Sequence, residues 1–131
     1  MSSYFNPPFL IAAALFAGAA ALHAFMGGPE INRPIQLADL EPTVRSTSAV
    51  VWHFVTALAL VMSGALVWLS RNPNRPVTVV VMAVNACFVL TFWTVGWAAF
   101  GSLWTMPQWS IFMTIAVVMA WGMRREKAKT W

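Results

Sequence analysis

Charged residues are scarce in this 131-residue sequence. Only 9% of its residues are charged, whereas a typical soluble domain carries about 25%. Hydrophobic residues make up 60% of the chain, and a small soluble domain cannot bury that much apolar surface because it exposes a large share of its area. The composition therefore excludes an ordinary soluble domain and indicates one domain that contacts a lipid bilayer.

Cysteine and catalytic motifs are also missing. The single cysteine, Cys87, excludes an intrachain disulfide and CxxC chemistry. No HExxH, GxSxG or glycine-rich phosphate loop occurs, and the pair Gly27-Gly28 indicates only a turn. The net charge of +4 does not indicate nucleic-acid binding, because four of the eight basic residues lie in the segment RREKAK directly after an apolar run. The sequence thus identifies no reaction and no nucleic-acid partner.

Long charge-free stretches are what the sequence does contain. A transmembrane helix needs about 20 predominantly apolar residues, and the stretch after Pro76 is too long for one helix and is interrupted by GSLWTMPQ. We predict an all-α protein with a single domain over residues 1–131, a four-helix transmembrane bundle in up-down-up-down order. Its predicted parts are spans at about 7–26, 47–69, 77–100 and 107–123, an outer loop at 27–46 and a tail at 124–131.

The distribution of lysine and arginine predicts the orientation. The side that holds both termini carries Arg71, Arg75, Arg124, Arg125, Lys127 and Lys129, and the other side carries Arg33 and Arg45. Because the basic side of a membrane protein faces the cytoplasm, we expect both termini there, in a bacterial inner membrane. The segment MSSYFNPP has no basic residue, so we expect the first span to be retained rather than cleaved as a signal peptide.

The outer loop contains conflicting signals. Pro29 and Pro34 disfavour a helix in its first half. Asp39 is a plausible N-cap, with Glu41 in the first turn and Pro42 tolerated there. We therefore expect the second long helix to begin near Leu40.

Each of the two histidines shares a helix face with small residues, which mark helix contacts in membranes. On the first helix these are Ala12, Ala13, Ala19 and Ala20 with His23; on the second they are Ala49, Thr56, Ala57, Leu60 and Gly64 with His53. We expect both faces to meet other helices. Asn85 lies near mid-membrane, where an unpaired amide costs several kcal/mol, and we expect it to bond a neighbouring helix.

His23 and His53 lie near one level on the outer side, because their helices are antiparallel and joined by the outer loop. Three interpretations stay open: structural hydrogen bonds to a carbonyl or a hydroxyl such as that of Thr56, a transition-metal site, or haem ligation or proton transfer. Adjacent helices favour an ion over haem, since two nitrogens on one ion lie only about 3–4 Å apart. A metal site would use His23, His53 and Glu30 and would hold copper, zinc or iron, with Met26 favouring copper.

A series of aromatic residues leads toward the same outer edge: Trp93, Trp97, Phe100 and Trp104. It is typical of a lipid-facing belt. The alternative is one wall of a pocket for a flat apolar ligand, for which we name Met26, Trp52, Trp97 and Trp104.

Three segments carry a resemblance: LHAFMGGPEINRPI, DLEPTVRS and VVWHFVT. Together, over residues 22–56, they resemble uncharacterised small four-span proteins of the bacterial inner membrane. The resemblance implies the fold and the location, and it implies no activity and no catalytic residues.

Two functions follow as hypotheses. The first is a small integral membrane protein with a histidine-based metal site on its periplasmic side. The second is a non-catalytic accessory or assembly subunit of a larger membrane complex for energy transduction or transport, in which the histidines are structural. The expected partners are lipid and either such a complex or further copies of the chain.

Overall fold

The computed structural model describes residues 4–129, and within this range every regular element is a helix. The all-α prediction is therefore confirmed. Side chains are described as far as Arg125, so Lys127 and Lys129, on which the predicted orientation partly depends, lie outside the described side chains. The elements are α1 (Pro7–Leu22), the π-helix η1 (His23–Asn32), α2 (Arg33–Leu37), α3 (Pro42–Leu69), α4 (Arg75–Phe100) and α5 (Trp109–Lys129).

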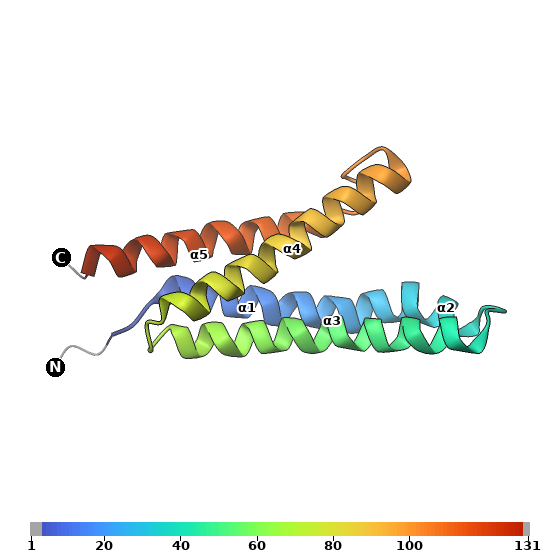
Figure 1. Cartoon of the computed structure of the whole chain (residues 1–131), viewed down its shortest axis with the longest axis horizontal. Helices are drawn as coiled ribbons and strands as arrows, with labels where there is room; N and C mark the ends of the chain where they lie inside the picture. Colours follow the sequence, from blue (N-terminus) through green and yellow to red (C-terminus); the bar gives the residue numbers. More distant parts are fainter. Residues whose placement is uncertain (1–3, 130–131) are drawn as a thin grey trace.

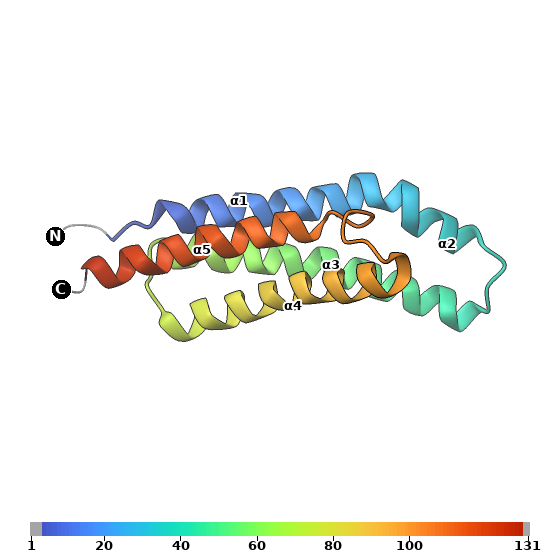
Figure 2. The ribbon, with the colours of Figure 1, turned by 90° about the horizontal axis from the view of Figure 1, so that it is seen from above.

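The helices form two hairpins: in Figure 1 α1 and α3 lie along the bottom, α5 lies above them, and α4 rises from the lower left to the upper right. α1 packs along α3, α4 packs along α5, and α5 also packs against α1. Both chain ends lie at one end of the molecule, which we call the terminal end (Figures 1 and 2). At the opposite, distal end, the turn between α2 and α3 projects beyond the connection between α4 and α5.

Three helices in the described part of the chain are long and apolar enough to cross a membrane: Pro7–Leu37, Pro42–Leu69 and Arg75–Phe100. They agree with the first three predicted spans, because charge-free length is a direct requirement of the bilayer. α5 covers most of the predicted fourth span at 107–123, beginning at Trp109, and runs on through the basic segment to Lys129, so much of the predicted tail is helical. A four-span bundle remains a prediction.

The predicted outer loop is mostly helical, which corrects our expectation for Pro29 and Pro34. Pro29 lies inside η1, and Pro34 lies in the first turn of α2, where its missing N–H is tolerated. In an α-helix the ring of a proline collides with the carbonyl four residues earlier. The wider turns of a π-helix, with their i→i+5 bonds, relieve that collision at Pro29.

α3 begins at Pro42, later than the predicted Leu40, and its N-cap is Glu41 rather than Asp39. The Glu41 carboxylate accepts hydrogen bonds from the backbone N–H groups of Thr43 (3.0 Å) and Val44 (3.3 Å). These are among the first N–H groups of the helix, which have no partner within it. A carboxylate also stabilises the positive end of the helix dipole.

The buried core lies in the half of the bundle toward the terminal end. α1 contributes its alanine face and two phenylalanines, while α3 contributes residues only from Ala59 onward. The α3 residues before Ala59, η1 and α2 contain no buried residue. The main apolar core side chains are Phe9, Ala12, Ala13, Phe16, Ala20, Ala59, Leu66, Leu69, Val81, Ile115 and Met119.

Asn85 confirms its predicted role within this core. Its side chain is fully buried, and Nδ2 donates to the carbonyl of Phe112 on α5 at 2.9 Å. The bond joins the two helices of the second hairpin at mid-height. The NH2 group of this amide therefore has a partner in the low-dielectric interior, whereas Oδ1 is buried without a hydrogen-bond partner among the described residues.

The terminal end is closed by contacts between the two ends of the chain. Asn6 Nδ2 donates to the carbonyl of Gly122 at 3.0 Å, and the Asn6 backbone N–H donates to the carbonyl of Ser70 at 2.8 Å. Gly122 lies directly under the ring of Phe9, where an added Cβ would come within 2.5 Å of a ring carbon. Only glycine therefore allows α5 to approach α1 this closely.

Candidate functional site

His23 lies at the junction of α1 and η1 and contacts α3. Its ring stacks on the indole of Trp52, with centroids 3.9 Å apart and planes 20° from parallel. Nε2 is 3.2 Å from the Trp52 carbonyl oxygen, and because a carbonyl can only accept, Nε2 is the donor. His23 thus makes the backbone hydrogen bond that the structural interpretation predicted.

Trp52 is held from both sides by this first hairpin. The His23 ring stacks on it, and Gly27, four residues further along η1, lies so near that an added Cβ would be 3.0 Å from the indole. The absence of a side chain at Gly27 makes room for the indole. Trp52 is therefore part of the packing between η1 and α3.

His53 follows Trp52 directly, but its side chain is exposed. Successive residues on a helix point in directions about 100° apart and do not share a face. The contact between His23 and Trp52 supports the prediction that both histidines lie at one level. It places His23 against the neighbour of His53 rather than against His53 itself.

The other predicted metal ligand, Glu30, and its neighbour Met26 are both exposed on η1. Among the described residues, no group of three or more histidine, cysteine, aspartate or glutamate side chains is placed to hold a metal ion. The metal site of His23, His53 and Glu30 therefore stays a prediction.

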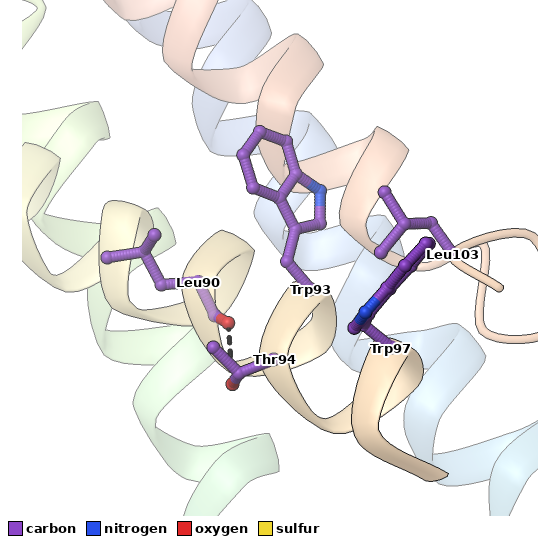
Figure 3. A pocket seen from close by; sticks show the side chains of 5 residues that line it. All are labelled: Leu90, Trp93, Thr94, Trp97 and Leu103. Carbon is purple, nitrogen blue, oxygen red and sulfur yellow. Dashed lines mark hydrogen bonds between the residues drawn. The ribbon is translucent and has the colours of Figure 1, made fainter. Parts of the chain in front are cut away.

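The aromatic residues of the predicted ligand pocket lie on separate parts of the fold. An open groove of about 510 Å³ runs along the distal part of α4, and Trp97 is one of its walls (Figure 3). Trp104 instead packs edge-on against Trp109, with centroids 5.3 Å apart, and Met26 and Trp52 belong to the other hairpin. The groove is lined by Leu90, Trp93, Thr94, Trp97 and Leu103.

This groove offers little polar chemistry. The Thr94 hydroxyl donates to the Leu90 carbonyl at 2.9 Å, the bond drawn in Figure 3. At its rim, the Leu103 carbonyl accepts from Trp109 Nε1 at 3.0 Å. Trp93 Nε1 is buried from solvent and has no hydrogen-bond partner among the described residues. The groove is therefore largely apolar, and its polar atoms include the indole N–H groups of Trp93 and Trp97.

The face of α3 around His53 is largely open within the described chain, although Ala49 and Thr56, which we also placed on it, are half-buried. Our expectation that this face meets another helix stays a prediction. Ala57, Leu60 and Gly64, which share the face, are exposed. Exposed residues recur along α3 at alternating spacings of four and three. We call this line the α3 seam; it consists of Ser46, Val50, His53, Ala57, Leu60, Gly64 and Val67.

The sequence carries no separate signal for the α3 seam, because positions at alternating spacings of four and three lie on one face of any helix. Sequence reasoning grouped His53 with small residues but did not identify the exposed line.

Comparisons of this chain with protein-family models, with curated proteins and with solved structures find no match. The functional argument therefore depends on the geometry of the chain itself.

Proposed function

We propose that this protein is a non-catalytic assembly subunit of a membrane complex, and that the α3 seam is where another membrane helix packs. The observation that carries the proposal is the exposure of His53 within a charge-free part of α3. His53 lies roughly 10 Å beyond Ser46 along the helix, at about 1.5 Å per residue. At this depth, ionisable side chains almost always face other protein rather than lipid.

The cost of leaving His53 in lipid supports this proposal. An imidazole N–H without an acceptor in hydrocarbon loses its hydrogen bond to water and gains none. His23 avoids this cost by donating to the Trp52 carbonyl. For His53 an acceptor on another molecule would serve the same purpose.

The other residues of the α3 seam support a helix rather than lipid as the neighbour. Ser46, Ala57 and Gly64 are small, and small residues let two helix backbones approach closely. Lipid tails make no such demand. The exposed surface of α4 also combines small residues such as Ala83 and Ala86 with large aliphatic ones such as Val79, so the imidazole of His53 is what distinguishes the α3 seam.

The proposal includes the finer topology that the sequence predicts. Four spans with both termini in the cytoplasm of a bacterium would place the distal end, and with it His53, on the periplasmic side. The partner helix would then enter the membrane from the same compartment. Labelling of a probe cysteine at Asn32 from the periplasmic side would agree with this orientation, and labelling only from the cytoplasmic side would contradict it.

Site-specific photo-crosslinking in the native host tests the assembly role. A photoreactive amino acid at Ala57 should trap a membrane helix, whereas the same group at Val80, on the outer surface of α4, should give mainly lipid adducts. Both positions are exposed, so the comparison controls for access. If Ala57 and Val50 both yield no protein adduct after purification, the proposed function is wrong.

The metal site is the second candidate function, supported by the common level of the two histidines. His23 contacts the residue that precedes His53, so both belong to one layer of the first hairpin. A transition metal held by them and Glu30 would require the His53 ring to turn toward η1. Elemental analysis of the purified protein beside a His23→Ala, His53→Ala double variant tests it, and equal metal content in both would eliminate the site.

A further inference from the structure

We infer that the terminal end of the bundle binds the headgroups of anionic phospholipids through a patch of exposed arginines. Two of these arginines flank the turn between α3 and α4, and the other two lie near the end of α5. We call this surface the arginine patch; it consists of Arg71, Arg75, Arg124 and Arg125. The inference concerns a different surface from the α3 seam and does not depend on the proposed function.

A single buried residue, Asn6, joins the two segments that carry the arginine patch. Its backbone N–H donates to the carbonyl of Ser70 at 2.8 Å, and its Nδ2 donates to the carbonyl of Gly122 at 3.0 Å. Ser70 directly precedes Arg71, and Gly122 lies two residues before Arg124. Two basic segments that are far apart in the sequence are therefore held together at one end of the fold (Figure 2).

Charge distinguishes the terminal end from the distal end. In the sequence, the arginine patch is accompanied by Lys127 and Lys129 and by a single acid, Glu126. The segment at the distal end has a mixed and slightly acidic set instead: Glu30, Arg33, Asp39, Glu41 and Arg45. A membrane surface that contains anionic lipids attracts clustered lysine and arginine residues. The terminal end therefore complements such a surface, and the distal end does not.

The guanidinium groups of the arginine patch are free to bind a phosphate. All four side chains are exposed, and within the described part of the chain no hydrogen bond or ion pair occupies them. A guanidinium presents a planar fork of N–H donors that matches two oxygens of a phosphate. The patch thus offers four such forks to a layer of headgroups.

The neighbours of the arginine patch favour a phospholipid over a soluble anion. Trp68 and Trp121, each about one helical turn from an arginine, are 48% and 50% exposed. Exposed tryptophans are typical of the boundary between headgroups and acyl chains. The guanidinium of Arg125 lies 6.0 Å from the centre of the Trp121 ring, so charge and apolar surface adjoin. Val67 and Val79, which are exposed on α3 and α4, extend this apolar surface. A ligand that complements all of these groups has both a phosphate and apolar tails.

Competition between two phospholipids tests the inference on the purified full chain. Mixed micelles would contain equal amounts of phosphatidylglycerol and phosphatidylcholine with identical acyl chains. Native mass measurement should then find mainly phosphatidylglycerol on the protein. Replacing all four arginines of the patch with glutamine should lower this preference at least about tenfold at low salt, because each arginine near an anionic surface strengthens binding about fivefold. High salt should weaken the preference of the wild type, since it screens exposed charges.

Two double variants form a matched pair. R71Q with R124Q removes one arginine from each segment of the patch and should lower the preference for phosphatidylglycerol. R33Q with R45Q removes two arginines from the distal end and should leave it unchanged. Circular dichroism should show unchanged helix content in R71Q with R124Q, because both side chains are exposed.

A local measurement shows where the lipid binds. Bromine atoms on an acyl chain quench nearby tryptophans, so brominated phosphatidylglycerol should quench the protein more than brominated phosphatidylcholine does. W121F should lose much of this excess quenching. W97F should keep it, because Trp97 is 65% exposed but lies on the distal part of α4.

The outcomes separate this inference from the proposed function. Equal phosphatidylglycerol preference in the wild type and in R71Q with R124Q would overturn the inference, and so would an equal loss in R33Q with R45Q. Excess quenching that disappears in W97F but not in W121F would place the lipid at the distal end and would overturn it as well. An acidic protein that co-purifies through the arginines, without any lipid preference, would also contradict it. None of these results depends on what a photoreactive group at Ala57 traps.

Discussion

Two faces of the first hairpin each combine a histidine with small residues, but one face is buried and the other is exposed. The alanine face of α1 leads to His23 and is buried, with Ala12 fully enclosed and Ala13 and Ala20 nearly so. The α3 seam contains His53, Ala57 and Gly64 and is exposed throughout. Small residues therefore mark a helix-contact face, but they do not say whether the partner helix belongs to the same chain.

The largest expected effect distinguishes the two faces by adding the same side chain to each. Ala12→Leu should destabilise the fold by about 3 kcal/mol, because a close-packed site has no room for the added carbons. Ala57→Leu should change the stability of the monomer by less than about 0.5 kcal/mol, since exposed positions tolerate substitution. Unfolding of the monomer in mixed detergent micelles measures both, and equal losses would mean that the α3 seam is packed within the chain.

Asn85 should contribute more than His53 to the stability of the monomer, because Asn85 has a hydrogen-bond partner within the chain and His53 has none among the described residues. Asn85→Leu removes the hydrogen bond to the Phe112 carbonyl and should cost about 1–2 kcal/mol. His53→Leu should leave the unfolding of the monomer unchanged. The same detergent titration gives both values, and a large loss for His53→Leu would show that His53 has a partner inside the chain.

Two glycines sharpen the comparison on a smaller scale. Gly122→Ala should destabilise by about 1 kcal/mol, because its methyl group meets the Phe9 ring and outweighs the better helix propensity of alanine. Gly18→Ala, on α1 with open space around it, should be neutral or slightly stabilising. Thermal unfolding of the two variants side by side would contradict this if Gly122→Ala proved the more stable.

The smallest expected effect separates stacking from hydrogen bonding at His23. His23→Phe keeps a ring against Trp52 and loses the hydrogen bond, so it should cost about 0.5–1 kcal/mol. His23→Ala loses both contacts and should cost about 0.5–1.5 kcal/mol more. Near-ultraviolet circular dichroism of the tryptophans should change more in the alanine variant, and identical spectra would argue against the stacked geometry.

The parts of the fold that depend on charge-free length were predictable from the sequence. The predicted spans at 7–26, 47–69 and 77–100 lie within the observed long helices, because the bilayer requires about 20 apolar residues whatever their detailed packing. The bond of Asn85 to a neighbouring helix was predictable for a similar reason. A mid-membrane amide leaves few alternatives.

The helical course of residues 27–37 was not predictable from local propensity. Pro29 and Pro34 argue against a helix one residue at a time, and the π-helical widening that accommodates Pro29 has no compositional signature. The exposure of His53 was not predictable for another reason. The face that it shares with Ala57 and Gly64 has the same pattern whether its partner lies within the chain or in another molecule, so only the three-dimensional structure shows that it is open.

The contact between the chain ends sets an order of events during synthesis. Asn6 and Gly122 are 116 positions apart, so their hydrogen bond cannot form until nearly the whole chain has left the ribosome. The first hairpin, by contrast, joins helices that emerge one after the other and can assemble early. Until α5 arrives, the side of α1 around Phe9 has only lipid to cover it. Gly122 then allows α5 to close onto α1.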